Sequence, residues 1–412
     1  MEKWVVTAKK ADFQGIGRKY GIDPVIARII RNRDITGDEA IEEYLNGTLA
    51  DIPSWKLLKD IDKAVEIISG KIDAGTKMRI IGDYDIDGVT ATYILLKGFK
   101  RLGANVDTYI PDRVADGYGI HDHLIKKAME DGIDTIVTCD NGISASSQIT
   151  YAKELGMTVV VTDHHEVPFT DNEEGRTYIL PPADAIINPK QADCTYPNKN
   201  ICGAVVAMKL VFALYEKYRL PEEEKEDFLE PAAIATVGDI MDLQGENRIL
   251  VKEGLARLPF TKNKGLKALI RAIGLEDQKI TSYDIGFRLG PCINASGRLD
   301  TAMRSLALLQ SEDEEEAAKL AGDLKALNDS RKALTEKGTE EAYKLIESSD
   351  LKNDRVMVVF LPECHESLAG IIAGRIREKY HKPTFVLTRG ESPKRQWQIH
   401  GKLFHVRGTG EM

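Results

Sequence analysis

Residues 78–88 read MRIIGDYDIDG, an apolar run that passes directly into a cluster of carboxylates. The pattern recurs twice, because TIVTC at 135–139 precedes DNG at 140–142 and TVVVT at 158–162 precedes DHH at 163–165. Each apolar run is short and rich in β-branched residues, as is typical of a buried strand. Ligands of parallel sheets collect at the carboxyl ends of the strands. The sequence therefore predicts three strand ends that carry acidic side chains at one edge of a sheet.

Segments with helical periodicity separate these strands. We expect helices near 89–102, 120–130 and 144–155, and further strands at 106–110 and 185–187. Strands that alternate with helices form a mostly parallel, right-handed wound sheet. The expected fold class is therefore α/β, and the pattern becomes helical between about 203 and 309.

The chain of 412 residues is long enough for two or three domains. We expect an N-terminal helical region at 1–70, a catalytic sheet domain at 71–310, a connecting helix at 311–350, a partial second α/β domain at 351–391 and an aberrant tail at 392–412. Residues 312–348 are nearly free of Gly and Pro, and we expect one long helix interrupted near 328–330. A surface helix of one large domain is the alternative.

Three carboxylate clusters at one edge would repel one another unless cations neutralise them. Asp83, Asp85 and Asp87 alternate along the first strand end, so their side chains could project to one side. Oxygen ligands with a few imidazoles and no thiolate favour manganese or magnesium over zinc. Each cluster alone is equally typical of a solvated turn, but their coincidence at successive strand ends predicts a two-metal hydrolase of phosphate esters.

Three other side chains are weaker candidates. Asp239 lies in ATVGDIMD at 235–242, between Gly and Ile, which is an unusual place for an unpaired carboxylate. It is a fourth candidate ligand, and a residue of a helix C-terminal turn is an equally good interpretation. His121 and His123 follow a glycine-containing loop and could contact substrate, although exposed histidines at a helix start are commoner.

Composition sets broad limits on function. The chain is 42% apolar and 29% charged, and no apolar run approaches the roughly 20 residues that a membrane span needs. Five scattered cysteines fit reduced thiols in a cytoplasm and neither a disulfide framework nor a zinc ribbon. The formal charge of −9 is weak evidence against a nucleic-acid partner, because bound cations lie outside that count.

The three acidic motifs together resemble the DHH phosphoesterase superfamily, named after the run Asp163-His164-His165. VGDIMDL at 237–243 resembles a further metal motif of that family. RLGPCINASGRL at 288–299 resembles a signature of the RecJ branch. This signature separates the RecJ branch from the phosphodiesterases that act on cyclic dinucleotides and short oligonucleotides. The resemblance implies 5′→3′ degradation of single-stranded DNA to mononucleotides in DNA repair and recombination.

The resemblance also implies roles for single residues. Two ions, Mn²⁺ or Mg²⁺, would be held by Asp85, Asp87, Asp140, His164 and Asp239, with Asp140 bridging. Asp83 is a further candidate ligand, at a position where many relatives have His. The implied catalytic residues are Asp140, His164 and His165, with His165 hydrogen-bonding or assisting at the phosphate. Arg288, Asn294 and Arg298 would contact the strand or its phosphates, since neighbouring glycines permit close approach. A helix-capping turn with a surface arginine is the alternative.

The expected partners are single-stranded DNA and a single-strand-binding protein or helicase that supplies it, with no membrane and a cytoplasmic location. Two rival functions stay open. One is a DHH phosphodiesterase acting on short oligonucleotides or cyclic dinucleotides. The other is a non-catalytic strand-binding or scaffold protein, although loss of metal ligands is the expected mark of that change and all the ligands are present.

The C-terminal part departs from the family pattern. HESLAGIIAGR at 365–375 resembles the start of the DHH-associated domain, which in the family continues into a GSGRS-like element and, in the RecJ branch, an OB fold. Residues 392–412 resemble neither, and we expect no strand or amphipathic helix there. Codons that fit Gln396-Trp397-Gln398, read one base later, encode Ser-Gly-Arg or Ser-Gly-Ser. We therefore expect a frameshifted tail and a truncated product with impaired strand binding.

Overall fold

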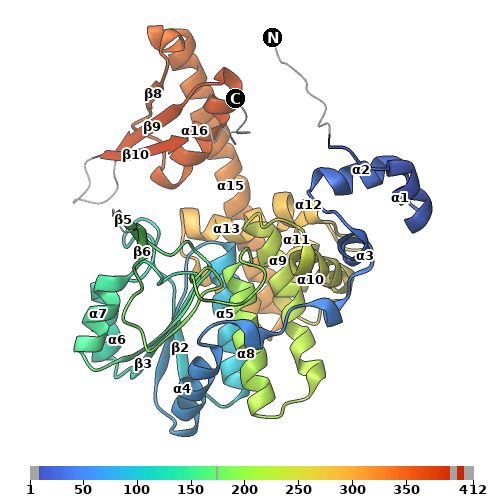
Figure 1. Cartoon of the computed structure of the whole chain (residues 1–412). Coiled ribbons are helices and arrows are strands. Elements are labelled where there is room, and N and C mark those ends of the chain that lie inside the picture. Colours follow the sequence, from blue (N-terminus) through green and yellow to red (C-terminus); the bar gives the residue numbers. More distant parts are fainter. Residues whose placement is uncertain (1–8, 173–174, 390–396, 403–412) are drawn as a thin grey trace.

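The computed structural model describes residues 9–172, 175–389 and 397–402 (Figure 1). Its centre is a five-stranded sheet in which every pair of neighbours is parallel, in the order β2-β1-β3-β4-β7. The strands are β1 (Met78–Ile81), β2 (Val106–Tyr109), β3 (Thr135–Cys139), β4 (Thr158–Thr162) and β7 (Ala185–Ile187). The predicted α/β class and parallel sheet are confirmed. The strand order reverses beside β1, and such a switch point is where open parallel sheets bind ligands.

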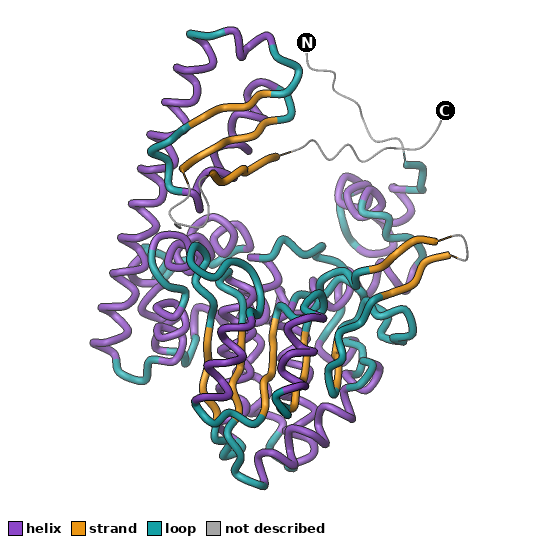
Figure 2. The backbone as a smooth tube through the Cα atoms, turned by 90° about the vertical axis from the view of Figure 1, so that its left-hand side faces the viewer, coloured by secondary structure: helices purple, strands orange, loops and turns teal. Residues whose placement is uncertain are grey.

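Helices cover both faces of this sheet, which explains why β1 and β3 are buried throughout. Alternate strand residues enter two separate cores. Ile80 and Val137 pack with α4 (Ile61–Asp73), α5 (Ile86–Arg101) and α8 (Gly203–Lys217) on one face. Ile81 and Ile136 pack with α6 (Asp122–Glu130) and α7 (Ser146–Glu154) on the other face. Figure 2 shows the strands side by side between these helices.

Further helices surround the sheet. The N-terminal helices pack around a small apolar cluster of their own, and α4 continues across residue 70 to contact α8 and β7. The remaining helices are α1 (Phe13–Tyr20), α2 (Pro24–Asn32), α3 (Asp38–Asn46), α9 (Leu229–Gly238), α10 (Gly245–Arg257), α11 (Lys264–Ala272), α12 (Ser282–Asp284), the π-helical turn η5 (Ile285–Leu289), α13 (Gly290–Leu299) and α14 (Met303–Gln310). Short 3-10 turns are η1 (Leu49–Asp51), η2 (Trp55–Leu57), η3 (Glu222–Phe228), η4 (Leu258–Phe260) and η6 (Asp350–Asn353).

The connecting helix α15 (Glu314–Glu347) runs without a break, so the expected interruption near 328–330 is wrong. Asn328 is buried inside it, and its side-chain amide lies 3.4 Å from the Cys292 sulfur of α13. Its carboxamide oxygen accepts hydrogen bonds from Arg331. Tertiary partners thus satisfy a polar side chain that would otherwise favour a helix end.

The C-terminal unit consists of β8 (Met357–Phe360), α16 (Glu366–Tyr380), β9 (Thr384–Arg389) and β10 (Trp397–Lys402). β8 and β9 are parallel, and β10 pairs antiparallel with β9 from Trp397 opposite Arg389 to Lys402 opposite Thr384. The expectation that no strand follows residue 391 is therefore wrong for 397–402, because the free edge of β9 can pair with an extended segment that follows. Residues 390–396 and 403–412, where the rest of the expected frameshifted tail falls, lie outside the described residues.

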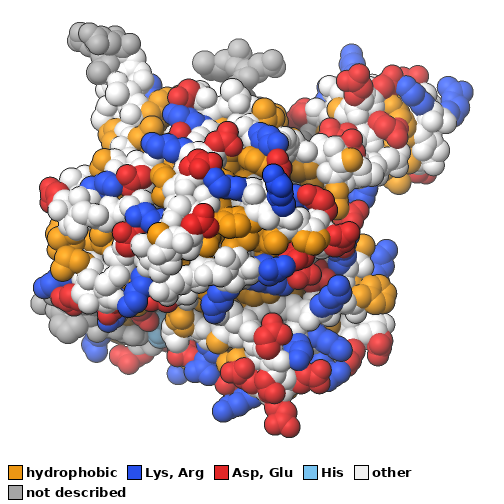
Figure 3. Space-filling model, turned by 90° about the horizontal axis from the view of Figure 1, so that it is seen from below, with side chains coloured by type: hydrophobic (Ala, Val, Ile, Leu, Met, Phe, Trp, Pro, Cys, Tyr) orange, Lys and Arg blue, Asp and Glu red, His pale blue; other side chains and the backbone are white. Residues whose placement is uncertain are grey.

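One hairpin was not expected from the sequence. β5 (Phe169–Asn172) and β6 (Gly175–Tyr178) pair antiparallel directly after the DHH motif and project beyond the carboxyl ends of the sheet strands (Figures 1 and 2). The opposite end of the molecule, seen from below, shows acidic and basic side chains interspersed (Figure 3). Within the described residues, every helix is too short or too polar to cross a membrane.

Candidate metal centre

The carboxyl ends of β1, β3 and β4 bring the predicted ligands together. Candidate ligand atoms lie within 4.8 Å of one another in three groups. The groups are Asp140 with His164 and His165, Asp87 with His164 and Asp239, and Asp83 with Asp85 and Asp140. All six predicted metal ligands and His165 therefore meet in one cluster.

The start of α5 orients the first two aspartates. Asp85 is the N-cap of this helix, and its carboxylate accepts hydrogen bonds from the amides of Asp87 at 2.9 Å and Gly88 at 3.1 Å. Asp87 is buried, and its two oxygens accept from the amides of Gly203 at 2.6 Å and Ala204 at 2.8 Å. These amides are free donors because they begin helix α8. The Asp87 carboxylate is thus fixed from a segment far away in sequence.

Asp140 adopts a left-handed backbone conformation with φ 59°, which is uncommon outside glycine and costs free energy. Its amide donates to the Thr162 carbonyl at 3.1 Å. The next residue, Asn141, donates its side-chain amide to the carbonyls of Ile81 at 3.1 Å and Cys139 at 2.9 Å. These bonds tie the ends of β1, β3 and β4 together and hold the strained turn in place.

Asp163, the first residue of the DHH motif, forms hydrogen bonds with backbone amides and with a histidine side chain. Its carboxylate accepts from the amides of Ile143 at 2.9 Å and His164 at 2.7 Å, and it lies 2.8 Å from Nδ1 of His165. Burial raises the pKa of Asp163, but the hydrogen bond with His165 outweighs this effect and keeps the pKa below its ordinary value. The same contact raises the pKa of His165 against the effect of burial. Asp163 therefore orients both histidines.

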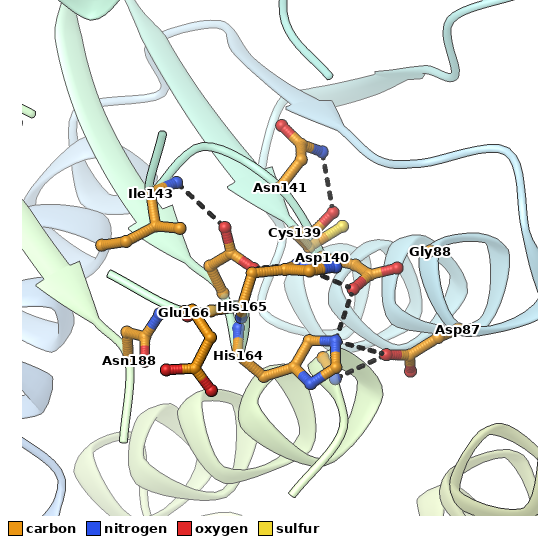
Figure 4. Close-up of polar contacts among 12 residues, drawn as sticks. Asp87, Gly88, Cys139, Asp140, Asn141, Ile143, His164, His165, Glu166 and Asn188 are labelled. Atoms are coloured by element: carbon orange, nitrogen blue, oxygen red, sulfur yellow. Dashed lines mark hydrogen bonds and ion pairs between the residues drawn. The ribbon is translucent and has the colours of Figure 1, made fainter. Parts of the chain in front are cut away.

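His164 points into the cluster of carboxylates (Figure 4). Its Nε2 lies 3.0 Å from Asp140 Oδ1, 3.5 Å from Asp87 Oδ2 and 3.6 Å from Asp239 Oδ2. Burial lowers the pKa of His164, which favours the neutral imidazole that binds metals.

The pKa values of the carboxyl groups in this cluster are raised, in contrast to that of His164. Burial, followed by the charge of neighbouring aspartates, raises the pKa of Asp83 and of Asp239 to about 8. The same causes raise the pKa of Asp140 well above its ordinary value. Carboxylates crowded in this way ionise together only when positive charge is nearby.

Buried atoms without partners show that these residues fit a metal. Asp83 Oδ1, Asp140 Oδ1, Asp239 Oδ2 and His164 Nε2 form no hydrogen bond among the described residues, although His164 Nε2 lies within ion-pair distance of the Asp140 and Asp239 oxygens. Leaving such atoms unsatisfied is costly, and nearly all buried polar atoms of folded proteins have partners. Divalent cations satisfy such atoms and reverse the raised carboxyl pKa values. Carboxylate oxygens with one imidazole are suitable ligands for manganese or magnesium.

The three residues expected to contact phosphate have other partners. The Asn294 carboxamide oxygen accepts from the Ile86 amide at 2.8 Å, so this residue positions the loop that carries the aspartates. Arg288 donates to Asp284 at 3.1 Å and to the Ile273 carbonyl at 2.9 Å, the end of α11. These contacts fit the capping alternative for Arg288, and the phosphate contact stays a prediction.

Arg298 joins two parts of the chain. Its guanidinium donates to the Ser367 carbonyl at 2.9 Å, and the Ser367 hydroxyl donates to the Arg298 carbonyl at 2.9 Å. Burial and the nearby charge of Arg113 lower its pKa to about 10. Helix α13 is thereby connected to the start of α16.

Sequence reasoning did not identify Tyr118. Its hydroxyl donates to the Asp140 carbonyl at 3.2 Å and lies 3.3 Å from Nδ1 of His165. Tyr118 and His121 line a cavity together with Asp163, whereas His123 pairs with Asp116 at 2.9 Å. The only sequence signal for Tyr118 is its place in a loop between two glycines.

Comparison with known proteins agrees with this geometry. A family model described as the DHH family, N-terminal domain, matches residues 77–236. The single-stranded-DNA-specific exonuclease RecJ of Escherichia coli (strain K12) is 35% identical over 376 residues, which are 88% of this chain and 63% of that relative. The chain therefore spans less than two thirds of the length of this curated relative.

Two solved structures are similar over most of the chain. RecJ of Thermus thermophilus in complex with Mn²⁺ gives a TM-score of 0.76 at 32% identity, covering 92% of this chain and 52% of that chain. Exonuclease RecJ bound to manganese gives a TM-score of 0.71 at 34% identity, covering 82% of this chain and 83% of that chain. The second match extends over most of both proteins.

Proposed function

Because this chain belongs to the DHH family, in the branch of the RecJ exonucleases, we propose that it degrades single-stranded DNA in a metal-dependent reaction. We assign it 5′→3′ polarity and mononucleotide products by its resemblance to that branch. The observation that carries the proposal is the set of buried, unpartnered atoms of Asp83, Asp140, Asp239 and His164. This set is suited to cations and lies at the switch point of the sheet.

Two divalent ions, Mn²⁺ or Mg²⁺, would be held by the side chains that converge here. The proposed ligands are Asp83, Asp85, Asp87, Asp140, His164 and Asp239. Asp140 is proposed to bridge, because it belongs to two of the three groups of candidate ligands. When bound, two such ions supply an activated water and stabilise the oxygens of an in-line displacement at phosphorus.

His165 is proposed to act on the phosphate itself. Its side chain is 43% exposed, and its Nδ1 is engaged by Asp163 at 2.8 Å. The Asp163 carboxylate accepts from Nδ1–H and raises the pKa of His165, which favours the protonated ring, in which Nε2 is also a donor and can reach a phosphate oxygen. The Tyr118 hydroxyl lies 3.3 Å from the same Nδ1 nitrogen.

Arg298 remains a proposed phosphate contact. The proximity of Arg113 and burial disfavour its charge, and an anion bound between the two guanidinium groups would relieve this repulsion. Asn294 contributes through the position of Ile86 and the two aspartates beside it. Arg288 is proposed as a further contact to the strand, and it would have to exchange its bonds to Asp284 and the Ile273 carbonyl for it.

The cellular role is proposed from the same relationship. Single-stranded DNA arises during repair and recombination, where a helicase or a single-strand-binding protein would present it to the enzyme. All five cysteines are free thiols, which supports a reducing compartment such as the cytoplasm.

Hydrolysis of 5′- and 3′-labelled single-stranded DNA with Mn²⁺, Mg²⁺ or EDTA tests the proposal, with Asp140→Ala as the control. We expect metal-dependent release of mononucleotides from the 5′ end that the substitution abolishes. Turnover of dinucleotides without attack on longer strands would instead identify the phosphodiesterase alternative. Strand binding without any hydrolysis would identify the non-catalytic one.

A further inference from the structure

Two aromatic side chains stack on each other at the surface. The rings of Tyr283 and Phe287 have centroids 4.6 Å apart and an interplanar angle of 24°. Their side chains are 64% and 65% exposed. Large aromatic groups usually gain free energy by burial, and an exposed pair of this kind marks a binding surface more often than a lone one. The two rings are called the stacking platform below, and Ile240, the second residue after α9, is a further exposed apolar side chain at 88%.

The stacking platform adjoins the metal centre through α9. Tyr283 lies in α12 and Phe287 in the π-helical turn η5, which packs against α9. A Cβ atom added to Gly286 in that turn would lie 3.8 Å from Val237, two residues before Asp239. Ile240 directly follows Asp239 and has a left-handed backbone, φ 58°. Single π-helical turns occur frequently at functional sites.

The surroundings of the stacking platform suit a strand that extends away from the metal centre. Figure 1 shows α12 and α13 at the end of the sheet domain that faces the C-terminal unit and the N-terminal helices. Lys279, four residues before Tyr283, is exposed and makes no ion pair within the part of the chain that the structure describes. The carboxylate of Asp284 is neutralised by Arg288 at 3.1 Å. Exposed flat rings match the faces of nucleobases, and Lys279, in the loop that precedes α12, offers a cation for the phosphate backbone.

We propose that Tyr283 and Phe287 bind unpaired nucleobases of the DNA strand by stacking, with Ile240 as a further apolar contact and Lys279 near the backbone. This inference rests on the proposed function and adds a base-binding surface to it. Stacking on aromatic side chains is independent of sequence, because every base has a flat face. It also selects single strands, since the bases of a duplex are already stacked on one another. The stacking platform would thus contribute to single-strand specificity outside the metal centre.

The test compares Tyr283→Ala/Phe287→Ala with the wild type and with Phe260→Ala. Phe260 is an equally large and even more exposed aromatic residue, 82%, in a different turn. The substrates are an oligothymidylate, the same oligomer with abasic sites and the dinucleotide pdTpdT, all with Mn²⁺. For the double variant we expect KM on the oligothymidylate to rise about tenfold or more. We expect less than a twofold change on the abasic oligomer, unchanged kcat on pdTpdT, and wild-type values for Phe260→Ala and Tyr283→Phe.

A binding measurement separates this inference from the proposed function. Fluorescence of a 2-aminopurine oligomer, measured in EDTA, reports stacking without hydrolysis. If the wild type quenches the fluorescence and the double variant does not, the stacking platform is supported. This holds even if neither protein hydrolyses any substrate. Absence of hydrolysis would overturn only the proposed function. Equal KM and equal quenching for both proteins would overturn the stacking platform. A changed sedimentation coefficient with unchanged KM would also overturn it, because the surface would then be a protein contact.

Discussion

The side-chain oxygen of Asn294 accepts a hydrogen bond from the backbone amide of Ile86 at 2.8 Å, joining positions 208 residues apart. Ile86 is the first residue of α5, between Asp85 and Asp87. Helix α13 also approaches this loop through Gly297, where a Cβ would lie 2.3 Å from the Tyr84 carbonyl oxygen. The aspartate loop is therefore shaped by a helix from another part of the chain as well as by its own sequence.

Replacement of Asn294 by Ala should weaken metal binding. The Ile86 amide would lose its acceptor in a partly buried place, which costs about 1–3 kcal/mol, and the loop that carries Asp85 and Asp87 would lose one restraint. We expect roughly a tenfold lower Mn²⁺ affinity in calorimetric titration and a lower midpoint in urea unfolding. Asn294→Asp keeps the acceptor oxygen and should bind Mn²⁺ more tightly than Asn294→Ala. Equal affinities for the two variants would contradict this role.

Gly297→Ala should impair the same loop by steric pressure. The added methyl group would meet the Tyr84 backbone oxygen, which cannot move without displacing the aspartates. We expect loss of Mn²⁺ binding together with about 1–3 kcal/mol of stability. The matched control is Gly322→Ala in α15, where nothing lies within 4 Å of the added atom. That substitution should stabilise the protein by about 0.5–1 kcal/mol, as Ala does in helices. Similar effects of both changes would exclude the steric explanation.

Stability of the metal-free protein should fall as pH rises towards 8. The folded-state pKa values of Asp83 and Asp239 are raised from 3.8 to about 8, so the folded protein holds more protons than the unfolded chain within this window. Folding then takes up protons, and the free energy of unfolding decreases with pH until about 8. The lowered pKa of His164 makes the free energy of unfolding rise with pH below about 6.5, because the unfolded chain then holds more protons at this residue. The decrease in the free energy of unfolding is therefore clearest between pH 6.5 and 8. Urea unfolding in EDTA at several pH values measures it.

Added Mn²⁺ should reverse this trend, because cations compete with protons for the same oxygens. We expect the melting temperature in fixed Mn²⁺ to rise relative to EDTA, by a larger amount at pH 8 than at pH 6. At a concentration one hundred times Kd, the stabilisation is about 2.7 kcal/mol. Asp140→Ala should lose most of it. A Mn²⁺ effect that does not depend on pH would argue against protonated ligands in the metal-free state.

Asp163→Asn should disturb both histidines without removing any of the proposed ligand side chains. An amide accepts through one oxygen only and carries no charge, so one or more of the bonds to Ile143, His164 and His165 is lost. Hydrogen bonds to charged groups contribute about 1.5–3 kcal/mol each. The pKa of His165 should fall, since Asp163 is what raises it. NMR titration of the His165 ring would show the shift, and an unchanged pKa would refute the assignment.

Much of the metal centre was predictable because its ligands follow buried strands in sequence. The apolar runs before Asp83, Asp140 and Asp163 place their carboxylates at one edge of the sheet once the strands are parallel. The family resemblance then favoured a ligand role for them over that of ordinary turn residues, which local patterns alone could not do. Asp239 is the instructive case, because only the packing of α9 beside α5 brings it to His164.

Other features depend on contacts that sequence patterns do not show. An arginine among glycines is typical of phosphate binding, yet Arg288 binds the end of α11. Asn328 favoured a helix break, but its partners on α13 and within α15 satisfy it in place. The pairing of β10 with β9 was missed although Trp397 and Ile399 alternate with polar residues, because this apolar–polar pattern covers only four residues. In each case the partner, distant in sequence or in another element, determines the outcome.

Helix α15 has a mechanical consequence. Its 34 residues extend for about 51 Å and carry the C-terminal unit at one end. As a rigid lever, it converts a tilt of about 10° at its base into a displacement of about 9 Å at its tip, given that length. The two hydrogen bonds between Arg298 and Ser367 hold this angle fixed near the metal centre. Loss of the bond from the Ser367 hydroxyl, as in Ser367→Ala, would therefore loosen this angle and change how wide a polymer can reach the cluster of aspartates, without touching any ligand.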